Sequence, residues 1–373
     1  MIRPLILIIL ILSFCVSLNF SDDDITTNTF TGLQAAYLRP KPLTEEAAQK
    51  FMADLKNWGV DEVFLEAQFF RVLNQSTVFP PKDPEKDWFK ILTQSAADNG
   101  LKVHAWVKVG YWVYGENNIK HVPILDEHRE WIDVNRRGNM VPEDGPEKHY
   151  IFVNLAIPEV RETVNAFISE LCDYDIDGVS IDYIRFKSAS SDPEDWFGYN
   201  EYSVRTFKEK TGLDPHNIKK DLSPGSDFMK WVKYNEIVVE NCVKSIKDNI
   251  EKINREKGKN IILSASPFTG YRPGQSPKFQ NWKPWDEKGY IDLWMPMCMS
   301  LDMKSLEKEI MGVKDLDLNA PYYPVVYPNQ HGSLHPPLKP HHEVLMKCGI
   351  DKYAVFSYKQ LKQDMDKIMN RED

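Results

Sequence analysis

The sequence contains few cysteines and no excess of positive charge. Five of its 373 residues are cysteine, and the formal net charge at pH 7 is −9. The four cysteines beyond the N-terminal segment are too widely spaced for a zinc module or a small disulfide scaffold, which leaves disulfides and buried thiols both open. They are Cys172, Cys242, Cys298 and Cys348. An acidic chain of this kind binds nucleic acid and anionic lipid poorly, so we expect neither as a partner.

Several catalytic motifs are also missing from the sequence. It contains no HExxH zinc motif, no GxSxG nucleophile elbow and no glycine-rich phosphate loop with its lysine. Histidines gather near the C-terminus, but prolines interrupt them and no ligand spacing emerges. These histidines are His331, His335, His341 and His342. We therefore expect no metal ion and no cofactor.

Long apolar runs occur only at the N-terminus. Arg3 precedes an apolar run over residues 4–16, and its length of about 13 residues fits a signal peptide and falls short of a membrane span. The small side chain of Ser17 and the polar residues 21–24 are typical of a cleavage site near Ser17. We predict a signal peptide at residues 1–17, secretion and no stable membrane insertion. An uncleaved N-terminal anchor is the alternative.

Strand-like and helix-like segments alternate along the rest of the chain. Runs of β-branched and aromatic residues predict strands, and apolar residues three to four positions apart predict helices between them. The predicted strands are residues 32–38, 63–66, 102–109, 177–185, 261–266, 291–299, 322–327 and 353–358. The predicted helices are residues 45–58, 88–99, 158–174, 199–211, 227–256, 303–311 and 342–348. We predict a short N-terminal segment at residues 18–30 and one domain at residues 31–373.

This alternation predicts an α/β fold, a single closed (β/α)8 TIM barrel. The alternative, an open doubly wound sheet, ordinarily carries a glycine-rich phosphate loop after its first strand, and none is present. Long loops follow strands three, four and five, at residues 110–150, 186–200 and 267–290. Short turns precede the strands. Because barrel active sites are built from the loops after the strands, these three loops are expected to surround the functional site.

The fourth predicted strand carries the sharpest local signal. In the run Asp177–Phe186, strand alternation places Ser180 and Asp182 on one face and Val179, Ile181 and Tyr183 on the other. In a barrel the first face points inward, so Asp182 is expected near the mouth. A buried carboxylate is costly unless it is paired, and Arg185 is a plausible partner. The alternative is an Asp–Arg pair that only closes the barrel.

The same region resembles the glycosyl hydrolase-like family 10 barrels. The resemblance rests on Pro158-Glu159-Val160-Arg161, a helix, and then Tyr174-Asp175-Ile176-Asp177-Gly178-Val179-Ser180-Ile181-Asp182-Tyr183-Ile184-Arg185. The run Val103-His104-Ala105-Trp106 and residues 291–297 are weaker matches. The resemblance implies a barrel that acts on glycans, with bacterial members directed at cell-wall polysaccharide. Two departures concern substrate range: residues 32–37 lack an aromatic-rich opening, and Lys187 stands where proline is common.

Glycoside hydrolysis ordinarily needs two carboxyl groups, and Asp182 supplies one. Glu66 ends the second predicted strand and alternates with Phe64 onto one face, so it ranks first as the second carboxylate. Asp302, after the sixth strand, ranks second, and Glu116 lies in the loop after the third. The fifth strand contains no acidic residue. The alternative for Glu66 is a hydrogen-bonded barrel residue that orients substrate.

Aromatic residues are frequent in the predicted mouth loops, and sugar rings stack on such side chains. The alternative is that these residues pin the loops to the barrel. His104 and Trp106 alternate onto the barrel-facing side with Lys108. The set of expected substrate-binding residues is Arg185, His104, Trp106, Tyr183, Tyr111, Trp112 and Trp285.

The sequence therefore predicts a secreted glycoside hydrolase that cleaves O-glycosidic bonds in a polysaccharide, cell-wall glycan being the class that the resemblance implies. Asp182 would act as nucleophile or acid/base, with Glu66 or Asp302 as the second carboxylate. The rival hypothesis is a carbohydrate-binding barrel without catalytic activity. A deacetylase would need a metal motif that the sequence lacks.

Overall fold

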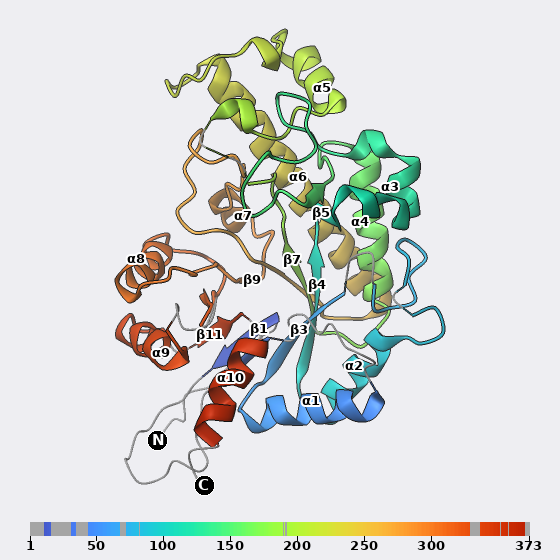
Figure 1. The fold of residues 1–373 in the computed structure, drawn as a ribbon, viewed down its shortest axis with the longest axis vertical. Coiled ribbons are helices and arrows are strands. Elements are labelled where there is room, and N and C mark those ends of the chain that lie inside the picture. Colours follow the sequence, from blue (N-terminus) through green and yellow to red (C-terminus); the bar gives the residue numbers. More distant parts are fainter. Residues whose placement is uncertain are drawn as a thin grey trace.

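The computed structural model describes most of the chain (Figure 1). The described residues are 11–15, 31–34, 44–67, 72–81, 83–188, 190, 192–328, 336–350, 352–356 and 358–369. The strands are β1 (Ile11–Cys15), β2 (Thr31–Gln34), β3 (Glu62–Glu66), β4 (Lys102–Lys108), β5 (Tyr111–Tyr114), β6 (Tyr150–Phe152), β7 (Gly178–Asp182), β8 (Ile262–Ala265), β9 (Leu293–Trp294), β10 (Val325–Val326) and β11 (Lys352–Val355).

The α-helices are α1 (Glu45–Asn57), α2 (Trp88–Asp98), α3 (Pro123–Glu127), α4 (Pro158–Leu171), α5 (Glu201–Thr211), α6 (Asp227–Lys257), α7 (Lys283–Glu287), α8 (Met303–Lys314), α9 (Leu338–Lys347) and α10 (Tyr358–Met369). Short 3-10 helices are η1 (Glu116–His121), η2 (Arg129–Trp131), η3 (Pro193–Asp195) and η4 (Pro215–Asn217). Side-chain caps mark several helix starts. The Thr44 hydroxyl accepts a hydrogen bond of 3.0 Å from the Ala47 N–H, which satisfies one of the unpaired amides of the first turn of α1.

Parallel strands form the centre of the molecule. β3, β4, β7, β8 and β9 are hydrogen-bonded in that order, and every pair is parallel. Isolated parallel bridges from Trp294 to Tyr322 and from Met297 to Val325 connect this sheet to the region of β10, which pairs in parallel with β11. Apart from the β5–β6 hairpin, the seven strands follow one another in chain order. The predicted α/β fold with a parallel sheet is confirmed.

The predicted closure of eight parallel strands is wrong for the described residues. β1 lies between β11 and β2 and is antiparallel to both, and this four-stranded sheet does not continue through hydrogen bonds into β3. Unpaired backbone groups at a sheet edge accept any β-prone segment, and the apolar run Ile11–Cys15 is one. β1 falls within the predicted signal peptide, whose other residues lie outside the described ones. Residues 35–38 of the predicted first strand also lie outside them.

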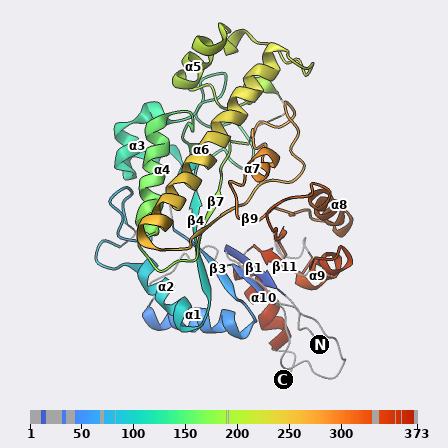
Figure 2. The same cartoon turned by 180° about the vertical axis from the view of Figure 1, so that it is seen from behind.

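Helices are distributed around the strands in a way that leaves one end more built up. α5 and the first half of α6 extend beyond the ends of β4 and β7, whereas α1 and α2 lie toward the opposite end (Figure 1). Seen from behind, α6 runs diagonally across the strands beside α4 (Figure 2). These outer helices bury one face against the sheet, as the spacing of their apolar residues predicts.

The inward faces of the strands form a small apolar cluster of their own. Phe64 of β3, Trp106 of β4, Leu293 of β9, Val325 of β10 and Ala354 of β11 are all buried in it. The larger cluster lies between the strands and the surrounding helices. The segregation follows from strand alternation, because successive side chains point to opposite faces of the sheet. The inner cluster forms the floor of the candidate site.

All four cysteines of residues 172–348 are buried and carry free thiols. Burial raises the pKa of the Cys172 and Cys242 thiols to about 12, so both stay protonated at neutral pH and act as packing residues. Among the described residues, no helix combines the length and the apolar character needed to cross a membrane.

Candidate active site

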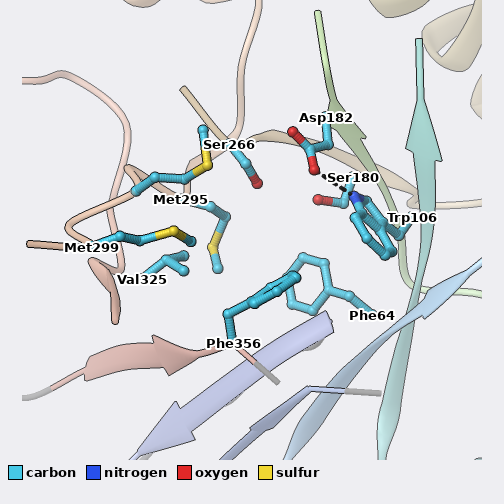
Figure 3. A pocket seen from close by; sticks show the side chains of 10 residues that line it. Phe64, Trp106, Ser180, Asp182, Ser266, Met295, Met299, Val325 and Phe356 are labelled. Atoms are coloured by element: carbon cyan, nitrogen blue, oxygen red, sulfur yellow. Dashed lines mark hydrogen bonds between the residues drawn. The ribbon is translucent and has the colours of Figure 1, made fainter. Parts of the chain in front are cut away.

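A pocket opens at the carboxyl ends of the parallel strands, on their inward face. Its volume is about 340 Å³ when the open solvent at its mouth is included, and it is lined by Phe64, Trp106, Ser180, Asp182, Ser266, Met295, Met297, Met299, Val325 and Phe356. Its two sides differ. Asp182, Ser180 and the Trp106 indole face the three labelled apolar side chains Met295, Met299 and Val325, with the phenyl rings of Phe64 and Phe356 below (Figure 3). The pocket therefore offers one polar side and one apolar side to a ligand.

Asp182 lies at the last position of β7, and its half-buried carboxyl group faces this pocket, as strand alternation predicts. The Trp106 Nε1–H donates a hydrogen bond of 3.2 Å to its Oδ2, and the Tyr183 N–H donates one of 2.6 Å to its Oδ1. Burial raises the pKa of the Asp182 carboxyl above its ordinary value, although these hydrogen bonds and the charges of Arg185 and Lys108 oppose the rise. A carboxyl group held in this way can retain a proton for transfer.

The backbone around Asp182 departs from regular strand geometry. Tyr183 has φ of +50°, in the left-handed region that non-glycine residues rarely adopt. The Val109 N–H donates to the Asp182 carbonyl at 2.8 Å, and the Gly110 N–H donates to the Tyr183 carbonyl at 3.1 Å. A Cβ atom at Gly110 would lie 2.8 Å from that carbonyl oxygen, so glycine permits this close approach. Strain of this kind is typical of functional sites and costs about 1–3 kcal/mol.

Glu66 and Lys108 form an ion pair beside Asp182. Glu66 ends β3 and Lys108 ends β4, and Lys108 is the register partner of Asp182 on β7. The Lys108 ammonium group also lies 4.7 Å from the centre of the Trp106 ring. Lys108 is buried and Glu66 is half-buried, with 17% of its side chain exposed. Glu66, the first-ranked candidate for the second carboxylate, therefore lies on β3, two strands away from Asp182 on β7. The strand between them, β4, carries the cation Lys108.

Arg185 does not form its ion pair with Asp182, which corrects the sequence-based expectation. Its Nη2 lies 2.7 Å from Oε1 of Glu147, and both side chains are buried. Burial alone would raise the pKa of the Glu147 carboxyl, but the Arg185 charge and the hydrogen bonds of Glu147 hold it below its ordinary value. The guanidinium group also lies 4.9 Å from the Tyr183 ring centre. Arg185 therefore acts on Asp182 only through its longer-range field.

Asp302 is exposed and is not among the residues that line the pocket. Its carboxylate accepts a hydrogen bond of 2.9 Å from the Ser305 N–H and caps the start of α8, and this bond lowers the pKa of the carboxyl group. The sequence pattern Asp-Met-Lys-Ser supports a cap as readily as a catalytic residue, because Asp is a favoured N-cap. Glu116, the third acidic candidate, begins η1 in the loop after β4.

His104 lies deeper in the strand interior than Asp182. It is buried, its Nε2 lies 3.0 Å from Oε2 of Glu62, and its ring stacks on Phe64 at 4.3 Å. Its register partner is Gly178, where a Cβ atom would lie 2.2 Å from the His104 Nδ1. His104 therefore occupies the layer below the pocket, where it supports Phe64.

Most aromatic residues of the mouth loops pin those loops to the fold. Trp112 and Trp285 are both 1% exposed, and the Trp112 Nε1–H donates to the Val109 carbonyl at 2.9 Å. Tyr111 is buried and stacks on Tyr150 at 4.3 Å, and Tyr183 lies 5.2 Å from Tyr111. Of the expected substrate-binding residues, Trp106 lines the pocket directly, Tyr183 donates its backbone N–H to Asp182, and the charge of Arg185 acts on the Asp182 carboxyl group.

Several site residues were missed by sequence reasoning. Met295, Met297 and Met299 alternate along the sixth predicted strand, and this period of two could have placed them on the inward face. Glu147 gave no local signal, because it lies in a loop and its importance comes from Arg185. The described residues contain no cluster of three potential metal-ligating side chains. His331 and His335 lie outside the described residues.

Comparisons with known proteins find likenesses in sequence and in fold. A sequence model of the glycosyl hydrolase-like 10 family matches residues 40–329. An S-layer-related protein of Niallia circulans is 23% identical over 200 residues, which cover 49% of this chain and 12% of that protein. The chain thus spans a small part of this relative.

Among solved structures, the catalytic domain of β-amylase from Paenibacillus polymyxa superposes with a TM-score of 0.55, 11% sequence identity and coverage of 86% of this chain and 90% of that one. The α-galactosidase of Thermus thermophilus gives a TM-score of 0.49 at 10% identity and covers 86% of this chain and 57% of that one. At such identities the β-amylase likeness concerns the fold.

Proposed function

The chain belongs to the glycosyl hydrolase-like 10 family, and we propose that it is a secreted glycoside hydrolase that cleaves O-glycosidic bonds in a polysaccharide. Secretion rests on the apolar N-terminal run that follows Arg3. A cell-wall or cell-surface glycan is the proposed substrate class, and the name of the S-layer-related relative supports a role at a cell surface.

The environment of Asp182 carries this proposal. Its carboxyl group ends a central strand, faces a pocket and has a pKa raised chiefly by burial. A carboxylic acid that retains its proton toward neutral pH can protonate the leaving oxygen of a glycosidic bond. Asp182 is therefore the proposed general acid.

Glu66 is the proposed second carboxylate, the base or nucleophile. It forms an ion pair with Lys108 at the end of the neighbouring strand. The Lys108 ammonium group lies between the two carboxyl groups, so its positive charge reduces the electrostatic repulsion between them. The Trp106 indole fixes the orientation of Asp182 on the other side.

The test compares Asp182→Asn with Asp175→Asn, an exposed aspartate before the same strand. Both purified chains and the wild type are incubated with a panel of polysaccharides that includes glycan strands stripped of peptide, and new reducing ends are measured. Release by the wild type and Asp175→Asn but not by Asp182→Asn, at an unchanged melting temperature, supports the proposal. Equal release by all three chains would contradict the role of Asp182.

A carbohydrate-binding protein without catalysis is the second candidate, and one observation favours it. Asp182 is the single acidic residue among the described residues that line the pocket, whereas hydrolysis ordinarily uses two carboxyl groups. Calorimetric titration with glycan fragments separates the candidates. Tight binding without any turnover would favour the binding protein over the hydrolase.

A further inference from the structure

A second, larger groove lies outside the pocket of Asp182. It is formed by the start of α4, by α5 and by the first half of α6, and it encloses about 1220 Å³ including the solvent at its mouth. α5 and this part of α6 lie at the built-up end of the molecule, beyond the ends of the central strands (Figures 1 and 2). The groove and the pocket share no lining residue.

The charge of this groove is opposite to that of the chain. Over the whole sequence 55 acidic residues outnumber 46 basic ones. Of the fifteen residues that line the groove, four are basic and none is acidic. The basic residues are Arg161, Lys210, Lys230 and Lys233. A concentration of one sign in a concave surface strengthens the local field, and here that field attracts anions.

Two of the four cations are not neutralised by carboxylates of the described chain. Lys230 lies 2.8 Å from Asp227 and Lys233 lies 3.4 Å from Glu236. Arg161 instead donates through Nη1 to the carbonyl oxygens of Leu155 and Ala156, at 2.7 and 2.8 Å. These carbonyls fix the guanidinium group in place and leave its charge uncompensated.

Lys210 is exposed, and its ammonium group lies 5.8 Å from the centre of the Tyr234 ring. The described residues place no carboxylate within ion-pair distance of it. The positive charge of Lys210 therefore lies near the Tyr234 ring in the groove.

The remaining lining residues suit a sugar chain. Tyr202 and Tyr234 are half-buried in the groove and expose part of their rings. Asn241 adds an exposed amide group that can exchange hydrogen bonds with sugar hydroxyls, whereas the hydroxyls of Thr206 and Thr211 donate to the carbonyl oxygens of Tyr202 and Phe207. Aromatic rings stack on the C–H faces of sugars, and neighbouring cations bind carboxylate or phosphate substituents.

We propose that this groove binds an anionic glycan chain, with Arg161 and Lys210 on its acidic groups and Tyr202 and Tyr234 against its rings. The shared chemistry is a saccharide polymer that bears carboxylates or phosphates. Such a site would hold a charged polymer at a distance from the pocket. It does not depend on whether Asp182 catalyses hydrolysis.

The test is calorimetric titration of the full chain at low ionic strength with three probes. These are an oligogalacturonate, a poly(glycerol phosphate) and a neutral maltooligosaccharide of similar length. The groove variant is Lys210→Gln. Its matched control is Lys208→Gln, which removes an exposed lysine of the same helix α5 that does not line the groove. Asp182→Asn is titrated beside them.

We expect the wild type, the control and Asp182→Asn to bind at least one anionic probe with similar Kd, and the neutral probe more weakly. The groove variant should lose about tenfold in affinity, since one charge-assisted contact is removed. The probe that binds identifies carboxylate or phosphate as the recognised group. The proposal is overturned if neither anionic probe binds, if the neutral probe binds equally well, or if the control loses as much affinity as the groove variant. Loss of hydrolysis in Asp182→Asn with binding retained would separate this site from the proposed catalytic site.

Discussion

The indole Nε1 of Trp106 donates a hydrogen bond of 3.2 Å to Oδ2 of Asp182 on the neighbouring strand. The bond fixes the orientation of the one carboxyl group that lines the pocket among the described residues. It also stabilises the charged form of that group and opposes the effect of burial on its pKa. This contact links the geometry of the site to its pH dependence.

Trp106→Phe should therefore raise the pKa of Asp182 further, because it removes a donor to the charged form while keeping an aromatic ring. If Asp182 is the general acid, the basic limb of the kcat/KM profile against pH should move to higher pH. The profile is measured on wild type and variant with the same polysaccharide. A limb that stays in place or moves to lower pH would contradict this role of the hydrogen bond.

Glu66→Gln should affect catalysis, whereas Asp302→Ala should affect stability. Glu66 pairs with Lys108, the register partner of Asp182, so if Glu66 is the second carboxylate its loss should reduce kcat by about a hundredfold or more, the range of a positioned acid or base. Asp302 caps α8, so its loss should lower the melting temperature by a few degrees and leave kcat unchanged. Steady-state kinetics and thermal unfolding distinguish the two. An intact kcat in Glu66→Gln would exclude Glu66 as the second carboxylate.

The Arg185–Glu147 pair should be important for stability. Glu147→Gln and Arg185→Met each leave one buried charge without its partner, and each should reduce the free energy of unfolding by about 3–5 kcal/mol. The double variant should lose less than the sum of the two single losses. Urea denaturation of the four chains gives the coupling. Strictly additive losses would mean that the two side chains stabilise the fold independently.

His342 should make the protein sensitive to mild acid. Burial lowers its pKa from 6.5 to about 4, and its Nδ1 lies 3.0 Å from the Tyr353 hydroxyl. The unfolded chain takes up a proton at higher pH than the folded chain does. Its contribution is therefore present above pH 6.5 and is lost as the pH falls toward 4, by about 3 kcal/mol at most.

The free energy of unfolding, measured from pH 7 to pH 4, should fall less steeply in His342→Gln than in the wild type. His121→Gln, which replaces an exposed histidine, is the control and should follow the wild-type slope. If both variants and the wild type show the same slope, His342 does not carry this dependence.

The sequence by itself determined the features that depend on local periodicity. Alternation along residues 177–185 was sufficient to place Asp182 on the inward face of its strand, since side chains in a strand alternate between two faces. The cap at Thr44 and the apolar spacing after it predicted α1 for a similar reason. The seven parallel strands and their order along the chain followed from the alternation of strand-like and helix-like segments. The family that the motif around Asp182 resembles is also the family whose model matches the chain.

The tertiary structure alone decided which residues meet. Glu147 and Arg185 are 38 positions apart, and Glu66 and Lys108 are 42 apart, so no local pattern connects them. The mouth-loop tryptophans Trp112 and Trp285 look the same in sequence whether they bind sugar or pack, and only their burial shows that they pack. The position of β1 between β11 and β2 was likewise invisible, because pairing at a sheet edge depends on which backbone groups remain unpaired once the other strands are in place.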